Sequence, residues 1–324
     1  MQAQTPAVLV ADIGGTNARF ALAQRGVAER PELHNVQQAA TADFASLKDA
    51  AAAYLKQTGA QPQRAVFAVA SAVTGDAIKI TNNPWSFSIT RLAADLGLQL
   101  QVINDFTAMA CVLPVLAAGD LQPIGNVASR AAVGERRCYA VVGPGTGLGV
   151  GGVIVENGRG VVIQSEGGHL GFAPGNDYEI ELLKALLPRF GRVSAERLVS
   201  GTGLVNLHDA VRAVAGLPEQ TLTPEQISEA AAADADGVCA KTLTVFAELL
   251  GAFAGDVALA FGAWDGVFLP GGVTQKLLPW ISAGGFRKRF EDKGRHSAIL
   301  QKIPTQVITH PQAGLLGTAV QALA

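Results

Sequence analysis

The most constraining feature of this chain is the segment Val8–Phe20, in which two apolar runs flank the sequence Asp-Ile-Gly-Gly-Thr-Asn. This pattern predicts two short strands joined by a tight glycine turn. Because Gly14 and Gly15 have no Cβ, their backbone N–H groups can come close to an anion. Asp12 ends the first run, where it could hold a divalent cation through water. Two interpretations stay open: a plain hairpin turn, or a turn that binds the phosphates of a nucleotide.

Two further glycine turns favour the second interpretation. An apolar run leads into Gly143–Gly149, and another leads into Pro-Gly-Gly-Val within Gly266–Val273. Neither turn is followed by the Gly-Lys-Ser/Thr of a P-loop. The alternating glycines of 143–149 lead into an apolar strand and not a helix, so they are not a dinucleotide-binding fingerprint. Three such turns, far apart in the sequence, predict a nucleotide held between two lobes.

Composition limits the partners of the chain. Its 324 residues allow two lobes with separate cores, and 25 basic against 27 acidic side chains give a net charge of −2. No large basic surface is implied, so nucleic acid is not an expected partner. Cys111, Cys138 and Cys239 lack Cys-x-x-Cys spacing, which is typical of reduced, buried thiols in a cytoplasmic protein. We expect no signal peptide and no apolar run long enough to span a bilayer, and hence no membrane partner.

Strands and helices are predicted to alternate, which indicates a mixed α/β fold. The predicted strands are 7–13, 19–22, 65–70, 78–81, 100–103, 139–142, 149–155, 161–164, 266–269 and 305–308. A helix at 44–57 would have Asp43 as its N-cap, and a helix at 89–96 would end at Gly97. The other predicted helices are 105–113, 177–187, 196–198, 204–213, 224–233, 237–261 and 314–323, and the glycines and alanines of 237–261 predict close packing. Strand–turn–strand units near Asp12 and Gly145 suggest a weak internal repeat.

Several acidic residues follow predicted strands or turns. Asp105 comes directly after the strand 100–103 and opens a helix, so it could be an N-cap or a general base. Glu166 and His169 are expected on a flexible loop, and two ligands at this spacing do not make a zinc site. Together they could recognise neighbouring hydroxyl groups. Glu196 could add a second acceptor, or it could be an exposed carboxylate paired with an arginine, Arg192 or Arg197.

A family resemblance joins these motifs. Asp12-Ile-Gly-Gly-Thr-Asn, Ile103-Asn-Asp-Phe, Gly145-Thr-Gly-Leu-Gly, Glu166-Gly-Gly-His and Ser194-Ala-Glu-Arg-Leu-Val-Ser-Gly occur in the order and spacing of bacterial glucokinases. The chain resembles the non-ROK glucokinases of the actin–hexokinase–Hsp70 superfamily. The likeness runs from Val8 to the Gly-Leu-Leu-Gly-Thr segment that begins at Gly314.

The resemblance implies two ribonuclease-H-like (actin-like ATPase) lobes with an interlobe cleft. A small α/β lobe would hold residues 1–115, completed by 307–324, and a large α/β lobe would hold 116–306. The implied reaction is phosphorylation of D-glucose at O6 by ATP with Mg²⁺, giving glucose 6-phosphate and ADP in glycolysis. The expected partners are glucose and MgATP, and the expected state is a cytoplasmic homodimer.

The resemblance also implies roles for particular residues. Asp105 would be the catalytic base, and the sugar would contact Asn104, Asp105, Glu166, His169 and Glu196. Mg²⁺ would be held by Asp12, through water. The nucleotide would contact Ala11, Asp12, Ile13, Gly14, Gly15, Thr16, Asn17, Gly145, Thr146, Gly147, Gly271 and Gly272. The loop Asn82–Trp85 would cover the sugar, although Trp85 could instead anchor this loop in the core.

Three residues depart from the family pattern, namely Pro144, Pro270 and Ser165. Because proline has no N–H, each of the two prolines removes a possible nucleotide donor. Two other functions remain as alternatives. A sugar-sensing regulator would need a DNA-binding helix-turn-helix, for which the segment before Ala7 leaves no room. A filament-forming ATPase would need no sugar for turnover and would leave Glu166, His169 and Glu196 without a purpose.

Overall fold

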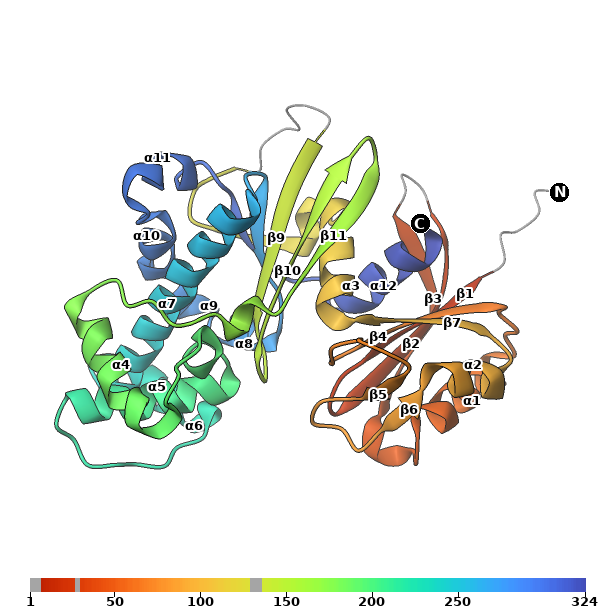
Figure 1. The fold of residues 1–324 in the computed structure, drawn as a ribbon, viewed down its shortest axis with the longest axis horizontal. Helices are drawn as coiled ribbons and strands as arrows, with labels where there is room; N and C mark the ends of the chain where they lie inside the picture. Colours follow the sequence, from red (N-terminus) through yellow and green to blue (C-terminus); the bar gives the residue numbers. More distant parts are fainter. Residues whose placement is uncertain (1–6, 27–29, 129–135) are drawn as a thin grey trace. The chain divides into compact units, whose positions relative to one another are not determined.

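The computed structural model describes residues 7–26, 30–128 and 136–324. The chain forms two compact units (Figure 1). Unit 1 contains residues 1–117 and 310–324, and unit 2 contains residues 118–309. The chain returns from unit 2 to unit 1 after Thr309, which is later than the 306/307 boundary expected from the sequence. The reason is that β13 (Thr305–Ile308) pairs with β8 (Leu121–Ile124) along its whole length and so belongs to unit 2.

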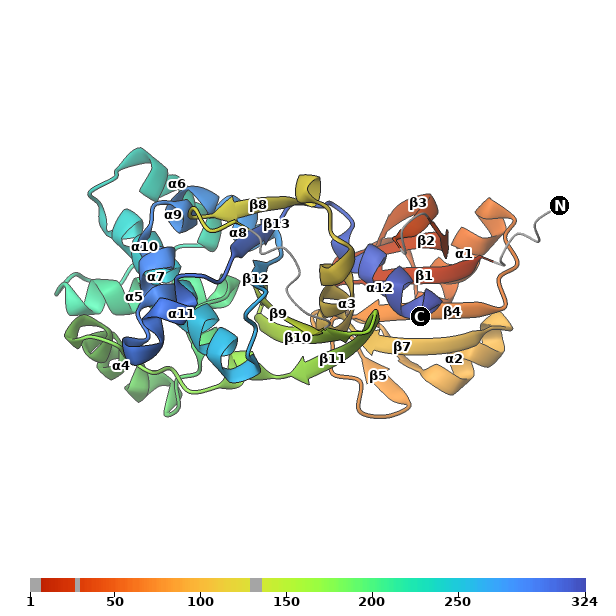
Figure 2. The same ribbon diagram turned by 90° about the horizontal axis from the view of Figure 1, so that it is seen from above.

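Unit 1 is a five-stranded sheet with helices on both faces (Figure 2). The strand order is β3-β2-β1-β4-β7, in which the β1–β2 and β2–β3 pairs are antiparallel and the others parallel. The strands are β1 (Val8–Ile13), β2 (Asn17–Arg25), β3 (Pro31–Ala40), β4 (Arg64–Val69) and β7 (Gln99–Asn104), with a separate hairpin of β5 (Ala77–Lys79) and β6 (Ser86–Ser88). The helices are α1 (Leu47–Thr58), α2 (Ile89–Leu96), α3 (Asp105–Val112) and α12 (Ala313–Leu323).

Alternation along β1 explains the two layers of unit 1. Leu9, Ala11 and Ile13 face the core under α1 and α2, whereas Val8 and Val10 face α3 and α12. All five side chains are buried, as expected for a central strand covered on both faces. Helices α3 and α12 pack so closely that a Cβ at Gly317 would collide with the Ala108 carbonyl oxygen.

The start of α1 differs from the sequence prediction. The helix begins at Leu47, and its N-cap is Ser46, whose side chain accepts a hydrogen bond from the Asp49 N–H. Asp43 ends a short 3₁₀ turn instead, so its assignment as the N-cap is wrong. By contrast α2 ends as predicted, because Gly97 has a φ of 66°. Strands β3, β6 and, in unit 2, β8 were not predicted.

The first five strands of the unit 2 sheet repeat the topology of unit 1, and β8 adds a sixth strand, antiparallel to β13. The sheet order is β11-β10-β9-β12-β13-β8, and the first three strands are antiparallel while β9, β12 and β13 are parallel. The internal repeat suggested by the sequence is therefore present in the strand order. The remaining strands are β9 (Arg136–Pro144), β10 (Leu148–Glu156), β11 (Arg159–Ser165) and β12 (Gly266–Leu269). The helices are α4 (Asp177–Phe190), α5 (Gly201–Val214), α6 (Pro224–Ala233), α7 (Val238–Phe261), α8 (Gly272–Lys276), α9 (Leu278–Ser282), α10 (Gly285–Glu291) and α11 (Ser297–Leu300).

Helix α7 is the centre of the unit 2 core. It has 24 residues and is long and apolar enough to cross a membrane, so the expectation that no apolar run reaches this length is wrong here. However, 67% of its most apolar window is buried within the protein. A Cβ at Gly251 or Gly255 would collide with backbone carbonyl oxygens of α10, so the predicted close packing is confirmed. The helix therefore lies in a packed core.

The three cysteines carry no disulfide. Cys111 is buried as expected, whereas Cys138 and Cys239 are only partly buried.

Candidate active site

The turn between β1 and β2 presents backbone donors. Its three residues are Gly14, Gly15 and Thr16, and the protein engages all three of their carbonyl oxygens. The Gly14 oxygen accepts from Asn83 Nδ2 at 3.0 Å, and the Gly15 oxygen accepts from the Thr41 hydroxyl at 3.1 Å. The Thr16 oxygen accepts from the Thr41 N–H at 2.9 Å. The Gly14 N–H closes the turn on the Asn17 oxygen, and the N–H groups of Gly15 and Thr16 make no hydrogen bond within the described chain.

The turn between β9 and β10 is arranged in the same way. The Gly145 oxygen accepts from the Gly201 N–H at 2.7 Å, and the Thr146 oxygen accepts from the Thr202 hydroxyl at 3.4 Å. The Gly147 oxygen accepts from the Gly145 N–H at 2.8 Å, which closes the turn. Over the residues that the structure describes, the N–H groups of Thr146 and Gly147 are left without a partner.

Each turn therefore offers two N–H groups to an outside acceptor, while its carbonyl oxygens are turned back into the protein. Successive N–H groups of this kind form a concave site for an anion. The third glycine turn lies beside the second, as the distance of 3.3 Å between a Cβ built at Gly271 and the Pro144 oxygen shows. Gly271 also has a φ of 98°, which favours glycine. Gly272 next to it begins α8.

Asn104 and Asp105 lie where β7 passes into α3. Asn104 is the N-cap of α3, since its Oδ1 accepts from the Phe106 N–H at 2.8 Å and its Nδ2 donates to the Ser71 oxygen at 3.1 Å. Asp105 is the first residue of the helix, although its Oδ1 also accepts from Phe106 N–H at 3.0 Å. The interpretation of Asp105 as the N-cap is wrong, and its carboxyl group is open to another role.

The charge state of Asp105 is unusual for a carboxyl group. The pKa of Asp105 is raised to about 7, because burial and, after it, the negative charge of Asp12 outweigh the lowering effect of hydrogen bonds from backbone N–H groups and the Asn104 side chain. A group with a pKa near neutrality can both accept and release a proton at working pH. Perturbed carboxyl groups of this kind concentrate at functional sites.

Asp12 completes this part of unit 1. Burial raises the pKa of Asp12, whereas Arg19, with Nη1 3.6 Å from Asp12 Oδ2, lowers it. A Cβ at Gly314 would lie 2.8 Å from the same oxygen, so the electropositive first turn of α12 lies against the carboxylate. This contact could not be predicted from the sequence, because Gly314 is 302 residues away from Asp12 along the chain.

The side chains that the structure describes limit which metal ions the protein could hold. Within the described residues no group of three or more His, Cys, Asp or Glu side chains is placed to hold a metal ion. Zinc and calcium sites of the usual kind need such a group. Mg²⁺ is often held by one or two carboxylates together with water and phosphate oxygens. Asp12, which is 22% exposed and close enough to raise the pKa of a second carboxyl, fits such a site.

Glu196 and His169 lie together in unit 2. His169 Nδ1 is 3.8 Å from Glu196 Oε1, and Glu196 Oε2 accepts from the Leu148 N–H at 2.9 Å. A Cβ at Gly147 would collide with Glu196 Oε2. The turn between β9 and β10 and the expected sugar residue Glu196 are therefore in direct contact, which the sequence analysis did not foresee.

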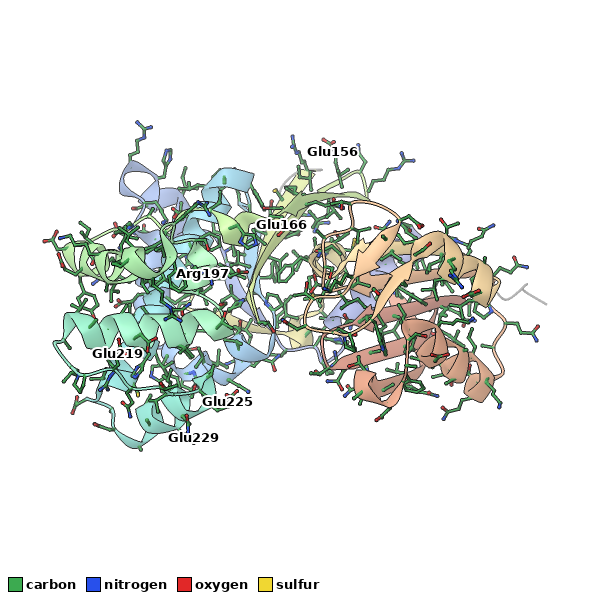
Figure 3. The ribbon with its side chains drawn as sticks, turned by 60° about the horizontal axis from the view of Figure 1, so that its bottom comes forward. Glu156, Glu166, Arg197, Glu219, Glu225 and Glu229 are labelled. Atoms are coloured by element: carbon green, nitrogen blue, oxygen red, sulfur yellow. The ribbon has the colours of Figure 1, made fainter. Side chains whose placement is uncertain are left out.

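The arginine alternative for Glu196 does not hold. Arg192 donates to the His169 carbonyl oxygen at 2.7 Å, and the Arg197 guanidinium lies 4.6 Å from the centre of the Phe190 ring. Neither arginine forms an ion pair with Glu196 in the described structure. Glu166 is exposed at the end of β11 (Figure 3).

The loop expected at residues 166–169 is more ordered than predicted. Gly167–His169 form a 3₁₀ turn, held by a hydrogen bond from His169 N–H to the Glu166 oxygen at 3.0 Å. Gly168 is packed so tightly that a Cβ would collide with the Leu148 oxygen. The turn is therefore fixed against β10.

Several of the remaining predicted residues pack in the core or support a turn. Ala11 and Ile13 are fully buried in β1, so their side chains face the core. Trp85 is 3% exposed and donates to the Phe44 oxygen at 3.2 Å, which is the anchoring role considered above. Asn83 also supports the Gly14 carbonyl, a contact that no sequence signal indicated.

Comparisons with known proteins agree with this picture. The family model described as Glucokinase matches residues 9–324. A glucokinase of Stenotrophomonas maltophilia (strain R551-3) is 48% identical over 324 residues, covering 99% of this chain and 96% of its own. The crystal structure of a glucokinase from an Antarctic psychrotroph has a TM-score of 0.89 at 36% identity, covering 98% of this chain and 99% of its own.

A more distant structure shares the fold. The glucokinase of Balamuthia mandrillaris, solved in complex with glucose, has a TM-score of 0.80 at 21% identity, covering 98% of this chain and 94% of its own. The mixed α/β architecture is thus that of the sugar kinases. Since the family model spans nearly the whole chain, the chain belongs to the glucokinase family. Enzymes of this family phosphorylate glucose.

Proposed function

We propose that the enzyme transfers a phosphoryl group from ATP to O6 of D-glucose, giving glucose 6-phosphate and ADP, the first step of glycolysis. The observation that carries this proposal is the pair of turns at Gly14–Thr16 and Gly145–Gly147. In both, all three carbonyl oxygens are engaged, and two N–H groups have no partner among the described residues and can bind an anion. Phosphate groups of a nucleotide are the natural ligands for such donors.

Asp105 is the proposed general base. Phosphoryl transfer to an alcohol needs alignment, charge neutralisation and a group to take the hydroxyl proton. A pKa of about 7 lets the Asp105 carboxylate take that proton at neutral pH. Asn104 is held by two hydrogen bonds and still has one donor hydrogen and one acceptor lone pair for a sugar hydroxyl.

Asp12 is the proposed residue for Mg²⁺, through water. When bound, the ion would neutralise negative charge on the transferring phosphates. The first turn of α12 at Gly314 and the Arg19 guanidinium hold the Asp12 carboxylate in place. Pro144 and Pro270 lie outside both turns, so the four N–H groups proposed here to bind phosphate are all present.

Glu166, His169 and Glu196 are proposed to bind hydroxyl groups of glucose. The Leu148 N–H and His169 orient the Glu196 carboxylate, and Arg192 holds the His169 backbone. A site that hydrogen-bonds hydroxyls discriminates against sugars that lack them, because its polar groups are then left unpaired. We also propose that the two units are ribonuclease-H-like lobes and that the enzyme is a cytoplasmic homodimer, which rests on the family resemblance.

The test is a coupled assay of ADP release with and without glucose. The proposal expects ADP release that depends on glucose and forms one glucose 6-phosphate per ADP. A filament-forming ATPase would release ADP equally without sugar. A sugar-sensing regulator would bind glucose without releasing ADP, and either result would overturn the proposal.

A further inference from the structure

A line of hydrogen bonds runs between β2 and β3 to the turn that is proposed to bind phosphate. Arg19 on β2 lies opposite Asp12 on β1 and opposite Gln38 on β3. Arg19 Nε is 3.1 Å from Gln38 Oε1, and Gln38 Nε2 is 3.1 Å from Asn17 Oδ1. Asn17 Nδ2 is in turn 3.1 Å from the Thr16 hydroxyl oxygen.

Arginine sets the direction of every bond in this line. A guanidinium has only hydrogens to donate, so the Gln38 atom that faces it must be the oxygen. The Gln38 nitrogen therefore faces Asn17 and donates to its oxygen, which leaves the Asn17 nitrogen to donate to Thr16. Since the Thr16 oxygen accepts this bond, the hydrogen of its hydroxyl remains available.

The Thr16 side chain is exposed, and its hydroxyl lies on the turn whose Gly15 and Thr16 N–H groups have no partner among the described residues. A donor hydroxyl beside two donor N–H groups matches an oxyanion and not a hydroxyl or a cation. We infer that Gln38 is a positioning residue that, through Asn17, sets the Thr16 hydroxyl as a third hydrogen-bond donor to a phosphate oxygen of the nucleotide. This inference rests on the proposed function.

The substitution Gln38→Glu tests the direction of the line. A carboxylate still accepts from Arg19, but it cannot donate to Asn17. The Asn17 amide must then turn its nitrogen towards position 38 and its oxygen towards Thr16, whose hydroxyl would donate to Asn17 and no longer to the ligand. Isothermal titration with Mg·AMPPNP, which avoids turnover, should show a dissociation constant raised by about tenfold or more, as for loss of a hydrogen bond to a charged group. Glucose affinity and the melting temperature should stay unchanged.

Two controls separate this effect from simple charge repulsion. Gln37→Glu adds the same charge one residue earlier, on the opposite face of β3, and should leave Mg·AMPPNP affinity unchanged. In a Thr16→Val background, which lacks the hydroxyl, Gln38→Glu should have no further effect on affinity. The non-additivity of this double-mutant cycle is the expected result.

Three outcomes would overturn the inference. The first is that Gln38→Glu binds Mg·AMPPNP as tightly as the unchanged protein, and the second is that Thr16→Val leaves the affinity unaltered. Equal weakening by Gln38→Glu with and without the Thr16 hydroxyl would assign the effect to charge alone. Failure of the proposed function is distinguishable, because the unchanged protein would then not bind Mg·AMPPNP or release ADP in response to glucose.

Discussion

The pKa of Asp105 predicts how activity depends on pH. With a pKa of about 7, the carboxylate is about 90% ionised at about pH 8 and about 9% ionised at about pH 6. If Asp105 is the base, kcat/KM for glucose should fall about tenfold between these pH values. A carboxyl at the ordinary value of 3.8 would stay ionised throughout and give no change.

The assay is steady-state kinetics at saturating MgATP across this pH range, for the unchanged enzyme and for Asp105→Asn. The amide cannot take the proton, so kcat should fall by about 10²–10⁴-fold, which is about 3–5 kcal/mol of barrier. The pH dependence should disappear with it, while glucose still binds. Asp43→Asn, with the same charge change on an exposed 3₁₀ turn, is the control and should behave as the unchanged enzyme. A flat profile, or the same pH limb in Asp105→Asn, would refute the reasoning.

Three further predictions follow from the same structure. The folded pKa of Asp105, about 7, lies above its unfolded value of 3.8, so stability is lost as the pH rises from about 4 to about 7 and stays lost above that. Asp105→Asn should therefore be more stable in urea at about pH 8, by at most about 4 kcal/mol, and not at about pH 4. Equal gains at both pH values would contradict this. Burial lowers the pKa of His208, so its contribution to stability should be complete above the unfolded pKa of 6.5 and should decline as the pH falls below it. His208→Gln should lose this part of the acid sensitivity. An unchanged dependence of urea stability on pH in His208→Gln would disprove this. Gly147→Ala should weaken both glucose and nucleotide binding, because the added Cβ would collide with Glu196. Gly145→Ala is the control and should bind glucose normally, because the atom nearest to its added Cβ is 3.9 Å away. An unaltered glucose KM in Gly147→Ala would argue against the contact between Gly147 and Glu196.

Much of the sheet could be predicted from local pattern, because its strands are apolar runs that end in glycine turns. β1, β9 and β12 are of this kind, and β1, β12 and the second half of β9 are buried on both faces. β3 was missed because it is an edge strand in which only Pro31 is buried, so it shows no apolar alternation. Because β3 was not predicted, neither were Gln38 nor the hydrogen bonds that lead from it to Thr16.

The site was harder to predict where it depends on contacts distant in sequence. Spacing could not separate the two uses of Asp105, since Asn104 and Asp105 are both common cap residues; only the structure assigns the cap to Asn104. The Asp43 error has the same cause, because Ser46 is an equally good cap three residues later. The contact of Glu196 with Gly147 joins segments that only folding brings together.

The most direct test of the central claim is the identity of the product. Proton-coupled ³¹P spectroscopy of the enzyme with glucose and MgATP should show ADP and one sugar phosphate whose signal is a triplet, because the two hydrogens on C6 couple to a phosphate on O6. A doublet would place the phosphate on a ring position with a single hydrogen. That result, or ADP and inorganic phosphate without any sugar phosphate, would contradict the account.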